Sequence, residues 1–275
     1  MQLTNPSITE SRPPRSILRS IGRAIGDYAM IRPGDRLLLG LSGGKDSLSL
    51  LQALLYLRDK APVPFTLAAA TVDPQIEGFD PSRLQPYVSA LGIPYYYQRQ
   101  AIVERALKTM RGDSFCAYCA RMRRGILYAT AREHDCNVLV LAQHLDDLAE
   151  SFLLSAFHGG DLRTMKAHYV NDEGDLRIIR PLVYVRERQL RNFAEAAHLP
   201  VITDSCPACF RMPGQRQHMK ELLAQEERNH PRLFANLLSA MRPLMVAENG
   251  GNPPTIDPSR ELEEDNDDHT RVGQR

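Results

Sequence analysis

The sequence has no tryptophan, few aromatic residues and no long hydrophobic run. Aromatic residues make up 7% of its 275 residues. Apolar stretches such as 37–41 and 50–55 are far shorter than the roughly 20 residues that a membrane-spanning helix needs. The N-terminal segment contains three prolines and lacks the apolar core of a secretory signal. We therefore expect a soluble cytoplasmic protein without a membrane partner.

Cysteine is also scarce, and its number is odd. Five cysteines fit a secreted disulfide framework poorly. Cys136 stands alone before an apolar segment, which is typical of a buried core cysteine. The other four form two C-x-x-C pairs, Cys116 with Cys119 and Cys206 with Cys209. Three uses of the pairs remain open: a structural Zn²⁺ site, which the spacing alone favours, an iron–sulfur cluster, or a dithiol that carries sulfur.

The chain has almost no net charge, yet its charges are unevenly distributed. Residues 247–275 contain eight acidic and three basic residues, so their net charge is −5. Because the whole chain has a net charge of +1, residues 1–246 have a net charge of +6. Few residues of this segment are apolar, so we predict a disordered acidic tail. Residues 1–15 are expected to form an irregular arm. A basic body is compatible with a nucleic-acid partner.

Short apolar runs alternate with segments of helical periodicity. This alternation predicts an α/β fold in which helices cover both faces of a parallel sheet, followed by a helical C-terminal end. The expected strands are 35–41, 66–72, 95–98 and 137–142, with further candidates at 178–180 and 200–202. The expected helices are 16–31, 48–58, 82–91, 119–134, 146–157, 216–224 and 232–241.

The first strand is followed by a loop with the composition of a phosphate-binding site. Two glycines allow a tight turn that brings backbone N–H groups to a phosphate, and the following helix adds its positive end. A lysine can neutralise phosphate charge, two serines can donate hydrogen bonds, and an aspartate can hold Mg²⁺. The loop consists of Ser42, Gly43, Gly44, Lys45, Asp46 and Ser47.

Acidic residues also open the helix after the fourth strand. Asp147 and Glu150 are three residues apart and therefore face the same side of a helix, just after His144. Carboxylates in this position can bind Mg²⁺, and they can equally cap the helix. Both interpretations remain open.

A cluster of arginines follows the first cysteine pair. Arg121, Arg123 and Arg124 lie on one predicted helix, with Arg121 and Arg124 on a shared face. They could contact RNA phosphates, and they could also form an ordinary solvated helix face.

The loop Ser42–Ser47 resembles the Ser-Gly-Gly-x-Asp-Ser signature of the PP-loop ATP pyrophosphatase superfamily. The resemblance implies a PP-loop domain over residues 16–246 that adenylates a substrate oxygen with ATP and releases pyrophosphate. It also implies that Asp73 lies near the adenosine and that residues 144–150 form a second nucleotide motif. The ATP-binding residues that it implies are Ser42, Gly43, Gly44, Lys45, Asp46, Ser47, Asp73, His144 and Asp147.

The segment that begins with the first cysteine pair is similar to the tRNA 2-thiocytidine synthetase family. In that family an Arg-rich helix follows a C-x-x-C pair, as residues 116–128 do here. The resemblance implies that Cys116, Cys119 and Cys206 hold a [4Fe–4S] cluster, with Cys209 as the alternative third ligand. It implies catalytic roles for Asp46, Lys45, Cys116 and Cys119, and Mg²⁺ binding by Asp46, Asp147 and Glu150. Further matches are Phe157-x-Gly-Gly160, Ile179-Arg-Pro-Leu182 and Tyr184-x-x-Glu187, whereas Gln143 departs from the usual Gly-His-His pattern.

These resemblances imply ATP-dependent thiolation of tRNA. The expected target is cytidine 32 of the anticodon loop, with tRNA bound by Arg121, Arg123 and Arg124 and sulfur supplied by a donor such as a cysteine desulfurase. A homodimer is left open. The alternatives are a PP-loop thiolase for a tRNA uridine, an amide-forming ligase of the same superfamily, and a zinc-stabilised RNA-binding protein without catalysis.

Overall fold

The computed structural model describes residues 11–76, 78–109, 115–202 and 214–246. The acidic tail and the pair Cys206 and Cys209 lie outside the described residues. Among the described parts, no helix is long and apolar enough to cross a membrane.

The described strands form one six-stranded sheet. Its order is β3-β2-β1-β4-β6-β5, and every neighbouring pair is parallel except β5 with β6. This arrangement confirms the predicted parallel α/β fold, to which β5 adds an antiparallel edge. The strands are β1 (Asp35–Gly40), β2 (Phe65–Asp73), β3 (Tyr95–Arg99), β4 (Val138–Val140), β5 (His168–Val170) and β6 (Arg177–Ile179).

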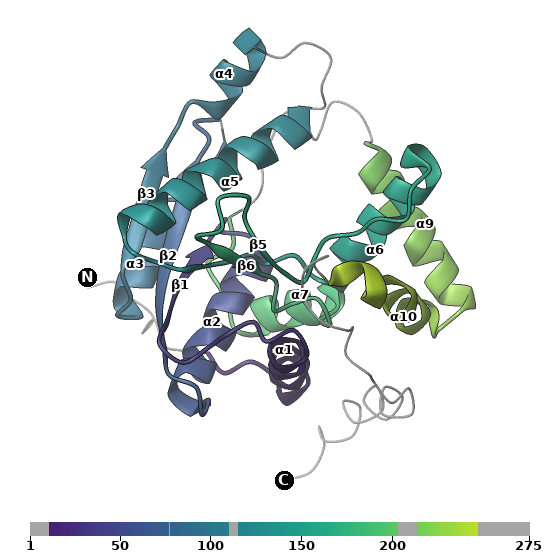
Figure 1. The fold of residues 1–275 in the computed structure, drawn as a ribbon, viewed down its shortest axis with the longest axis horizontal. Helices are drawn as coiled ribbons and strands as arrows, with labels where there is room; N and C mark the ends of the chain where they lie inside the picture. The colour runs from purple at the N-terminus through teal and green to yellow at the C-terminus, as the bar shows by residue number, and fades with distance from the viewer. Residues whose placement is uncertain (1–10, 77, 110–114, 203–213, 247–275) are drawn as a thin grey trace, which may run out of the picture.

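Helices cover both faces of the sheet (Figure 1). Alternate residues of a strand point to opposite faces, so Leu37 and Leu39 of β1 pack in one core and Leu38 packs in another. Helices α1, α2, α7 and α10 contribute to the larger core, and α5 covers the opposite face with Leu127 and Ala131. These helices are α1 (Arg15–Asp27), α2 (Lys45–Lys60), α5 (Phe115–Glu133), α7 (Glu187–Ala196) and α10 (Leu233–Met245).

The remaining helices lie around this framework. Helices α6, α9 and α10 form a group beside the sheet, where α6 packs against both α9 and α10 (Figure 1). A short π-helix, η1, continues α6. The bounds are α3 (Leu84–Ala90), α4 (Ile102–Thr109), α6 (Leu145–Leu154), η1 (Ser155–Gly159) and α9 (Gln215–Asn229).

Several element predictions need correction. Helix α2 begins at Lys45 rather than residue 48, so half of the phosphate loop belongs to its first turn. Helix α5 begins at Phe115, about one turn before the predicted start, and therefore includes both cysteines of the first pair. The candidate strand 200–202 is not a strand: the Ile202 N–H donates to the Gly43 carbonyl at 2.8 Å, outside the sheet ladder. Helices α4 and α7 and strand β5 were not predicted.

Candidate functional site

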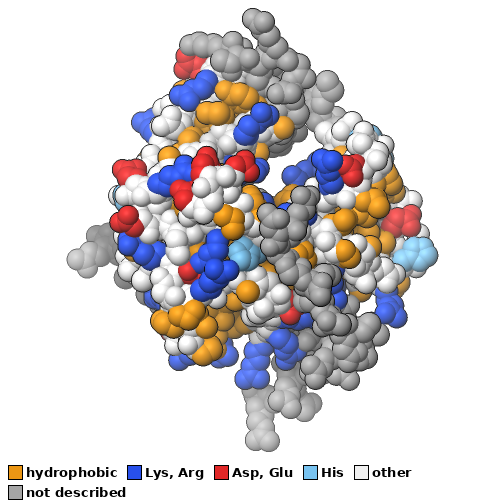
Figure 2. All heavy atoms as spheres, viewed as in Figure 1, with side chains coloured by type: hydrophobic (Ala, Val, Ile, Leu, Met, Phe, Trp, Pro, Cys, Tyr) orange, Lys and Arg blue, Asp and Glu red, His pale blue; other side chains and the backbone are white. Residues whose placement is uncertain are grey.

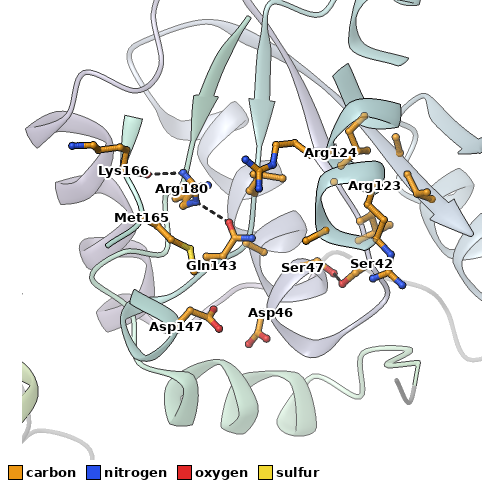
Figure 3. A pocket seen from close by; sticks show the side chains of 18 of the residues that line it. Ser42, Asp46, Ser47, Arg123, Arg124, Gln143, Asp147, Met165, Lys166 and Arg180 are labelled. Carbon is orange, nitrogen blue, oxygen red and sulfur yellow. Dashed lines mark hydrogen bonds between the residues drawn. The ribbon is translucent and has the colours of Figure 1, made fainter. Parts of the chain in front are cut away.

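A cavity of about 810 Å³ opens at the carboxyl ends of strands β1, β2 and β4. Ligands of α/β proteins bind at this edge of a parallel sheet. The wall includes the phosphate loop, one side of α5, the residue after β6 and the segment 165–169 (Figure 3). Lys and Arg side chains lie at the rim of the hollow between the sheet and helices α6 and α9 (Figure 2). The cavity therefore offers a largely cationic environment beside the phosphate loop.

Glycine is required at the tightest point of the phosphate loop. Gly43 has φ +84°, and a Cβ atom there would lie 2.6 Å from Ile202 Cδ1. Gly44 caps α2 without a side-chain hydrogen bond, so the first N–H groups of the helix remain available to an anion. The hydroxyl oxygens of Ser42 and Ser47 lie 3.1 Å apart and form a hydrogen bond, and both residues line the cavity. The local geometry thus supports phosphate binding.

Asp46 projects from the first turn of α2 into the cavity (Figure 3). Its Oδ2 atom accepts a hydrogen bond from Lys45 Nζ at 3.1 Å, whereas its Oδ1 atom is buried and has no hydrogen-bond partner among the described residues. Burial raises the pKa of Asp46, and the nearby His144 and Lys45 offset only part of that rise. A buried, unpartnered carboxylate oxygen is a suitable ligand for a hard cation.

Lys45 lies beside Asp46 but does not line the cavity. Its Nζ atom is 3.0 Å from Glu187 Oε1, at the start of α7. Burial lowers the pKa of Lys45, but Asp46 and Glu187 outweigh that effect and raise it. The structure therefore places the expected phosphate-neutralising lysine in an ion pair with Glu187, a residue to which the sequence motif assigned no role.

The motif 144–150 combines capping with ion pairing. The His144 N–H donates to Asp147 Oδ2 at 3.0 Å, and the Asp147 N–H donates to His144 Nδ1 at 3.3 Å, so the two residues form a capping box. Arg216 of α9 donates to Asp147 at 3.2 Å and to Glu150 at 2.8 Å. Both carboxylates do face one side of the helix, and that side is occupied by an arginine.

Mg²⁺ would be held by few protein ligands here. Within the described ranges, no group of three or more His, Cys, Asp or Glu residues is arranged to bind a metal. Mg²⁺ commonly takes one or two carboxylates and completes its shell with water and nucleotide phosphates. The unpartnered Asp46 oxygen and the cavity-lining Asp147 fit that pattern. Arg216 contacts both Asp147 and Glu150, but Glu150 does not line the cavity and therefore fits the pattern less well.

Asp73 ends β2 at the same edge of the sheet but does not line the cavity. Its carboxylate accepts hydrogen bonds from the Tyr97 hydroxyl and from the Gln75 N–H. Burial, together with the hydrogen bond to Asp73, raises the pKa of Tyr97 to about 12. The expected contact of Asp73 with adenosine stays a prediction.

Helix α5 brings two of the three expected arginines into the cavity. Arg123 and Arg124 line it, one turn after Ala120 and one turn before Leu127, whereas Arg121 does not. Within the described ranges, the Arg123 Nε atom is buried without a hydrogen-bond partner. A buried N–H donor of this kind at a cavity is suited to an anionic ligand.

The described part of the chain includes three of the five cysteines. Cys136 is buried in the core between α5 and the sheet, as predicted, and burial raises the pKa of its thiol. Cys119 is partly exposed in the first turn and a half of α5. The backbone of Cys116 opens the same helix, and the pair Cys206 and Cys209 falls outside the described residues. The ligand set expected for the cysteines stays a prediction.

The cavity also contains a polar pair that motif reading did not assign. Arg180, the residue after β6, is 6% exposed, and its Nε atom donates to Gln143 Oε1 at 2.9 Å. Its Nη1 atom donates to the Lys166 carbonyl at 2.6 Å. Burial lowers the pKa of Arg180. Arg180 belongs to a motif already noted, but only the fold brings it to Gln143.

Comparison with known proteins identifies the relatives of this chain. A family model described as a PP-loop domain matches residues 15–226. The tRNA-cytidine(32) 2-sulfurtransferase of Geobacter metallireducens is 40% identical over 228 residues, which are 82% of this chain and 89% of the relative. The protein of the same name from Syntrophotalea carbinolica is 40% identical over 85% of this chain and 91% of its own length.

A solved structure shares the fold. The U34-tRNA thiolase NcsA from Methanococcus maripaludis, determined with its [4Fe–4S] cluster, has a TM-score of 0.70 and 23% sequence identity, and the match covers 84% of this chain and 78% of that one. This likeness confirms the fold predicted from the strand and helix pattern. The family model and the curated relatives agree with the resemblance noted in the phosphate loop and the cysteine helix. The chain belongs to the PP-loop domain family and, within it, to the tRNA-cytidine(32) 2-sulfurtransferases.

Proposed function

We propose that this protein uses ATP to replace the 2-oxygen of cytidine 32 in tRNA with sulfur. The observation that carries the proposal is the continuity of one cavity from the phosphate loop to the arginines of α5. ATP and a nucleotide of an RNA chain can meet in such a cavity. Relatives of the stated name match more than four-fifths of the chain, which supports the same substrate.

The phosphate loop would bind the triphosphate. The free N–H groups at the start of α2 and the hydroxyls of Ser42 and Ser47 supply donors, and Gly43 keeps the backbone close. Asp46 and Asp147 would hold Mg²⁺, which neutralises phosphate charge. Lys45 and Glu187 hold the other Asp46 oxygen in place through an ion-pair network.

The first chemical step is adenylation. The 2-oxygen of cytidine attacks the α-phosphorus of ATP, a new O–P bond forms, and the bond to the β-phosphate oxygen breaks to release pyrophosphate. Attack by sulfur at C2 then breaks the C2–O bond and AMP leaves. The cationic side chains Arg123 and Arg124 are placed to stabilise the negative charge of the phosphates in both steps.

The cysteines would serve the sulfur step. Thiolates are the ligands of iron–sulfur clusters, and Cys116 and Cys119 begin the helix whose next turns line the cavity. We propose that these two and Cys206, or Cys209 in its place, hold a [4Fe–4S] cluster, which supplies a binding place for sulfide when present. A sulfur donor such as a cysteine desulfurase completes the reaction.

The exposed arginines would bind the RNA backbone. Arg121 and Arg124 are both exposed on α5, and Arg124 also lines the cavity. Phosphate contacts of this kind position the RNA and weaken as salt concentration rises.

Nucleoside mass spectrometry tests the proposal. Transfer RNA from cells that lack the protein should contain no 2-thiocytidine, and the complemented strain should regain it. Persistence of 2-thiocytidine would contradict the proposal. Loss of a thiouridine instead would favour the uridine alternative. A purified protein that binds tRNA but releases no pyrophosphate from ATP would favour the non-catalytic alternative.

Reconstitution tests the metal assignment. Anaerobic loading with iron and sulfide should produce the broad visible absorbance of an iron–sulfur cluster, and Cys116→Ala should abolish it. Cys136→Ala is the matched control, because that thiol is buried in the core and should leave the absorbance unchanged. A colourless protein that binds zinc stoichiometrically would overturn the assignment.

A further inference from the structure

We propose that Gln143, locked in one orientation by Arg180, reads the Watson–Crick edge of the target base and selects cytosine over uracil. The inference rests on the proposed function and names the residue that sets its base specificity. Gln143 lines the cavity between Arg180 and the phosphate-loop residues Asp46 and Ser47 (Figure 3). A base that contacts Gln143 therefore lies next to the ATP phosphates.

Arg180 is a buried cation that has no carboxylate partner among the described residues. It donates hydrogen bonds to Gln143 Oε1 and the Lys166 carbonyl, and it also interacts with the Tyr169 side chain, so these partners are all formally uncharged groups. Its guanidinium carbon lies 5.4 Å from the centre of the Tyr169 ring. Burying a guanidinium without an opposite charge is costly, so folding stability alone gives little reason for an arginine here. The hydrogen bond from Arg180 to Gln143 indicates a different role, which is to orient the Gln143 side chain.

The guanidinium decides which way the Gln143 amide points. A guanidinium has only donors, so the amide must turn its oxygen toward Arg180 and its NH₂ group away. No residue in the described part of the chain accepts a hydrogen bond from that Nε2 atom, and the side chain borders the cavity (Figure 3). Rotation of the amide would bring NH₂ against the guanidinium. Gln143 therefore turns its NH₂ donor, rather than its oxygen, toward the cavity.

This donor distinguishes the two pyrimidines. Cytosine has an acceptor at N3 beside its acceptor at O2, whereas uracil has an N3–H donor. The Nε2 group of Gln143 can donate to N3 of cytosine, but it faces the N3–H of uracil donor to donor, whereas O2 is an acceptor in both bases and does not discriminate. A glutamine free to rotate would accept from uracil as readily as it donates to cytosine. The Arg180 lock removes that second option, and an unmatched donor in a buried site is heavily penalised.

The cavity is suited to an unstacked nucleotide. Enzymes that modify a base inside a folded nucleic acid turn it out of the stack and read its Watson–Crick edge with hydrogen bonds. The volume of about 810 Å³ lies within the range of ligand pockets that enclose most of a small molecule. Arg123 and Arg124 also line this cavity, where they can meet the phosphates on either side of the base.

The test compares two tRNA transcripts that differ only in carrying C or U at position 32. The cluster-loaded enzyme is given ATP and a sulfide source, and product formation is measured by mass spectrometry as kcat/KM. The wild-type protein should prefer the C32 transcript roughly 10- to 100-fold or more. In Gln143→Glu the carboxylate pairs with Arg180 and presents only acceptors, so the preference should reverse or disappear.

The variant Arg180→Met tests whether Arg180 orients Gln143 or only contributes to folding stability. It removes the lock and the buried charge together while keeping an unbranched side chain, so thiolation of C32 should persist and that of U32 should rise. Met165→Leu is the matched control, since it changes an apolar side chain of the same cavity and should leave the C/U ratio unchanged.

The outcomes of the two proposals differ. A wild-type protein that thiolates C32, with Gln143→Glu showing the wild-type C/U ratio, would overturn the role of Gln143 and leave the proposed function intact. Equal use of both transcripts by the wild-type protein would also overturn it. A wild-type protein that thiolates neither transcript would instead contradict the proposed function.

Discussion

At the scale of one residue, the buried carboxylate of Asp46 favours ligand binding at the expense of folding stability. One of its carboxylate oxygens is buried and has no partner in the described part of the chain, and burial raises the pKa of Asp46. A carboxylate with a raised pKa makes the folded state less stable once it is ionised. The cation that we propose for Asp46 therefore explains the residue better than a contribution to folding stability does.

We predict that Asp46→Asn lowers Mg²⁺-dependent pyrophosphate release by about 100-fold or more, because it removes the charge that holds the ion. The same change should leave the free energy of unfolding within about 1 kcal/mol of the wild-type value, or raise it, because a buried charge disappears. Denaturant unfolding and pyrophosphate assays measure the two effects. Asp59→Asn, at an exposed position of the same helix, is the control. A large loss of stability in Asp46→Asn would show a structural role instead.

Glu187 has the opposite electrostatic character. Burial raises its pKa, but hydrogen bonds from Lys220 and Lys45, at 2.7 Å and 3.0 Å, outweigh that effect and lower it from 4.5 to about 2. Because the folded-state pKa is depressed, the ionised carboxylate stabilises the fold above pH 4.5, and this contribution disappears as the pH falls toward 2.

We predict that Glu187→Gln lowers the free energy of unfolding at pH 7 by about 1–3 kcal/mol. The difference from the wild-type protein should shrink as the pH falls below 4.5 toward 2. Denaturant titrations across this range measure it. Glu195→Gln, at an exposed position of the same helix, should show no such dependence. A difference that stays constant with pH would contradict the ion-pair account.

At the scale of elements, one arginine joins four helices around the nucleotide motif. Arg186 precedes α7 and donates to Asp146 of α6 and to both carboxylate oxygens of Glu227 in α9, at 2.6 Å and 2.9 Å. Its guanidinium carbon lies 3.2 Å from the centre of the Phe234 ring in α10. Burial lowers the pKa of Arg186, but its acidic partners outweigh that effect and raise it.

Arg186→Lys should destabilise the protein by about 2–4 kcal/mol, because an ammonium group cannot make two bidentate contacts and stack on a ring at once. Arg188→Lys is the control: Arg188 is 54% exposed and lies 3.8 Å from the same glutamate. Thermal unfolding of the two variants measures the difference. Equal melting temperatures would show that the charge of Arg186, rather than its shape, holds the helices together.

At the scale of the whole molecule, opposite charges occupy different parts of the chain. The net charge of +6 before residue 247 accompanies the arginines at the cavity, and the segment 247–275 carries −5. Oppositely charged segments of one chain attract each other within a few Debye lengths, about 10 Å each at 0.1 M salt. From charge alone, we expect the acidic segment to compete with tRNA for the surface that we assign to it.

Deletion of residues 247–275 should increase tRNA affinity at low salt, and the increase should vanish at high salt, where charge interactions are screened. Binding titrations at several salt concentrations measure the effect. A variant in which the eight acidic residues become their amides is the matched control for length and should behave like the deletion. If the deletion leaves the tRNA affinity at low salt unchanged, the acidic segment does not compete with tRNA.

Features that depend on neighbouring residues were predictable from the sequence. The strand, the glycine turn and the helix from Asp35 to Lys60 follow from a short apolar run, two glycines and helical periodicity within one stretch of chain. The burial of Cys136 was predictable for the same reason. The short strand β5 and helices α4 and α7 were not, because their few turns or residues carry a weak local signal and are stabilised by packing.

The sequence by itself determined the family, the parallel sheet and the phosphate loop, because each depends on residue types at short, regular spacing. Only the tertiary structure decided what each site residue contacts. It pairs Lys45 with Glu187 in a salt bridge and joins Asp73 to Tyr97 and Gln143 to Arg180 by hydrogen bonds. The partners in each pair are far apart in the chain. The physical reason is that a parallel sheet gathers the carboxyl ends of distant strands at one edge, and the pairing there depends on strand order.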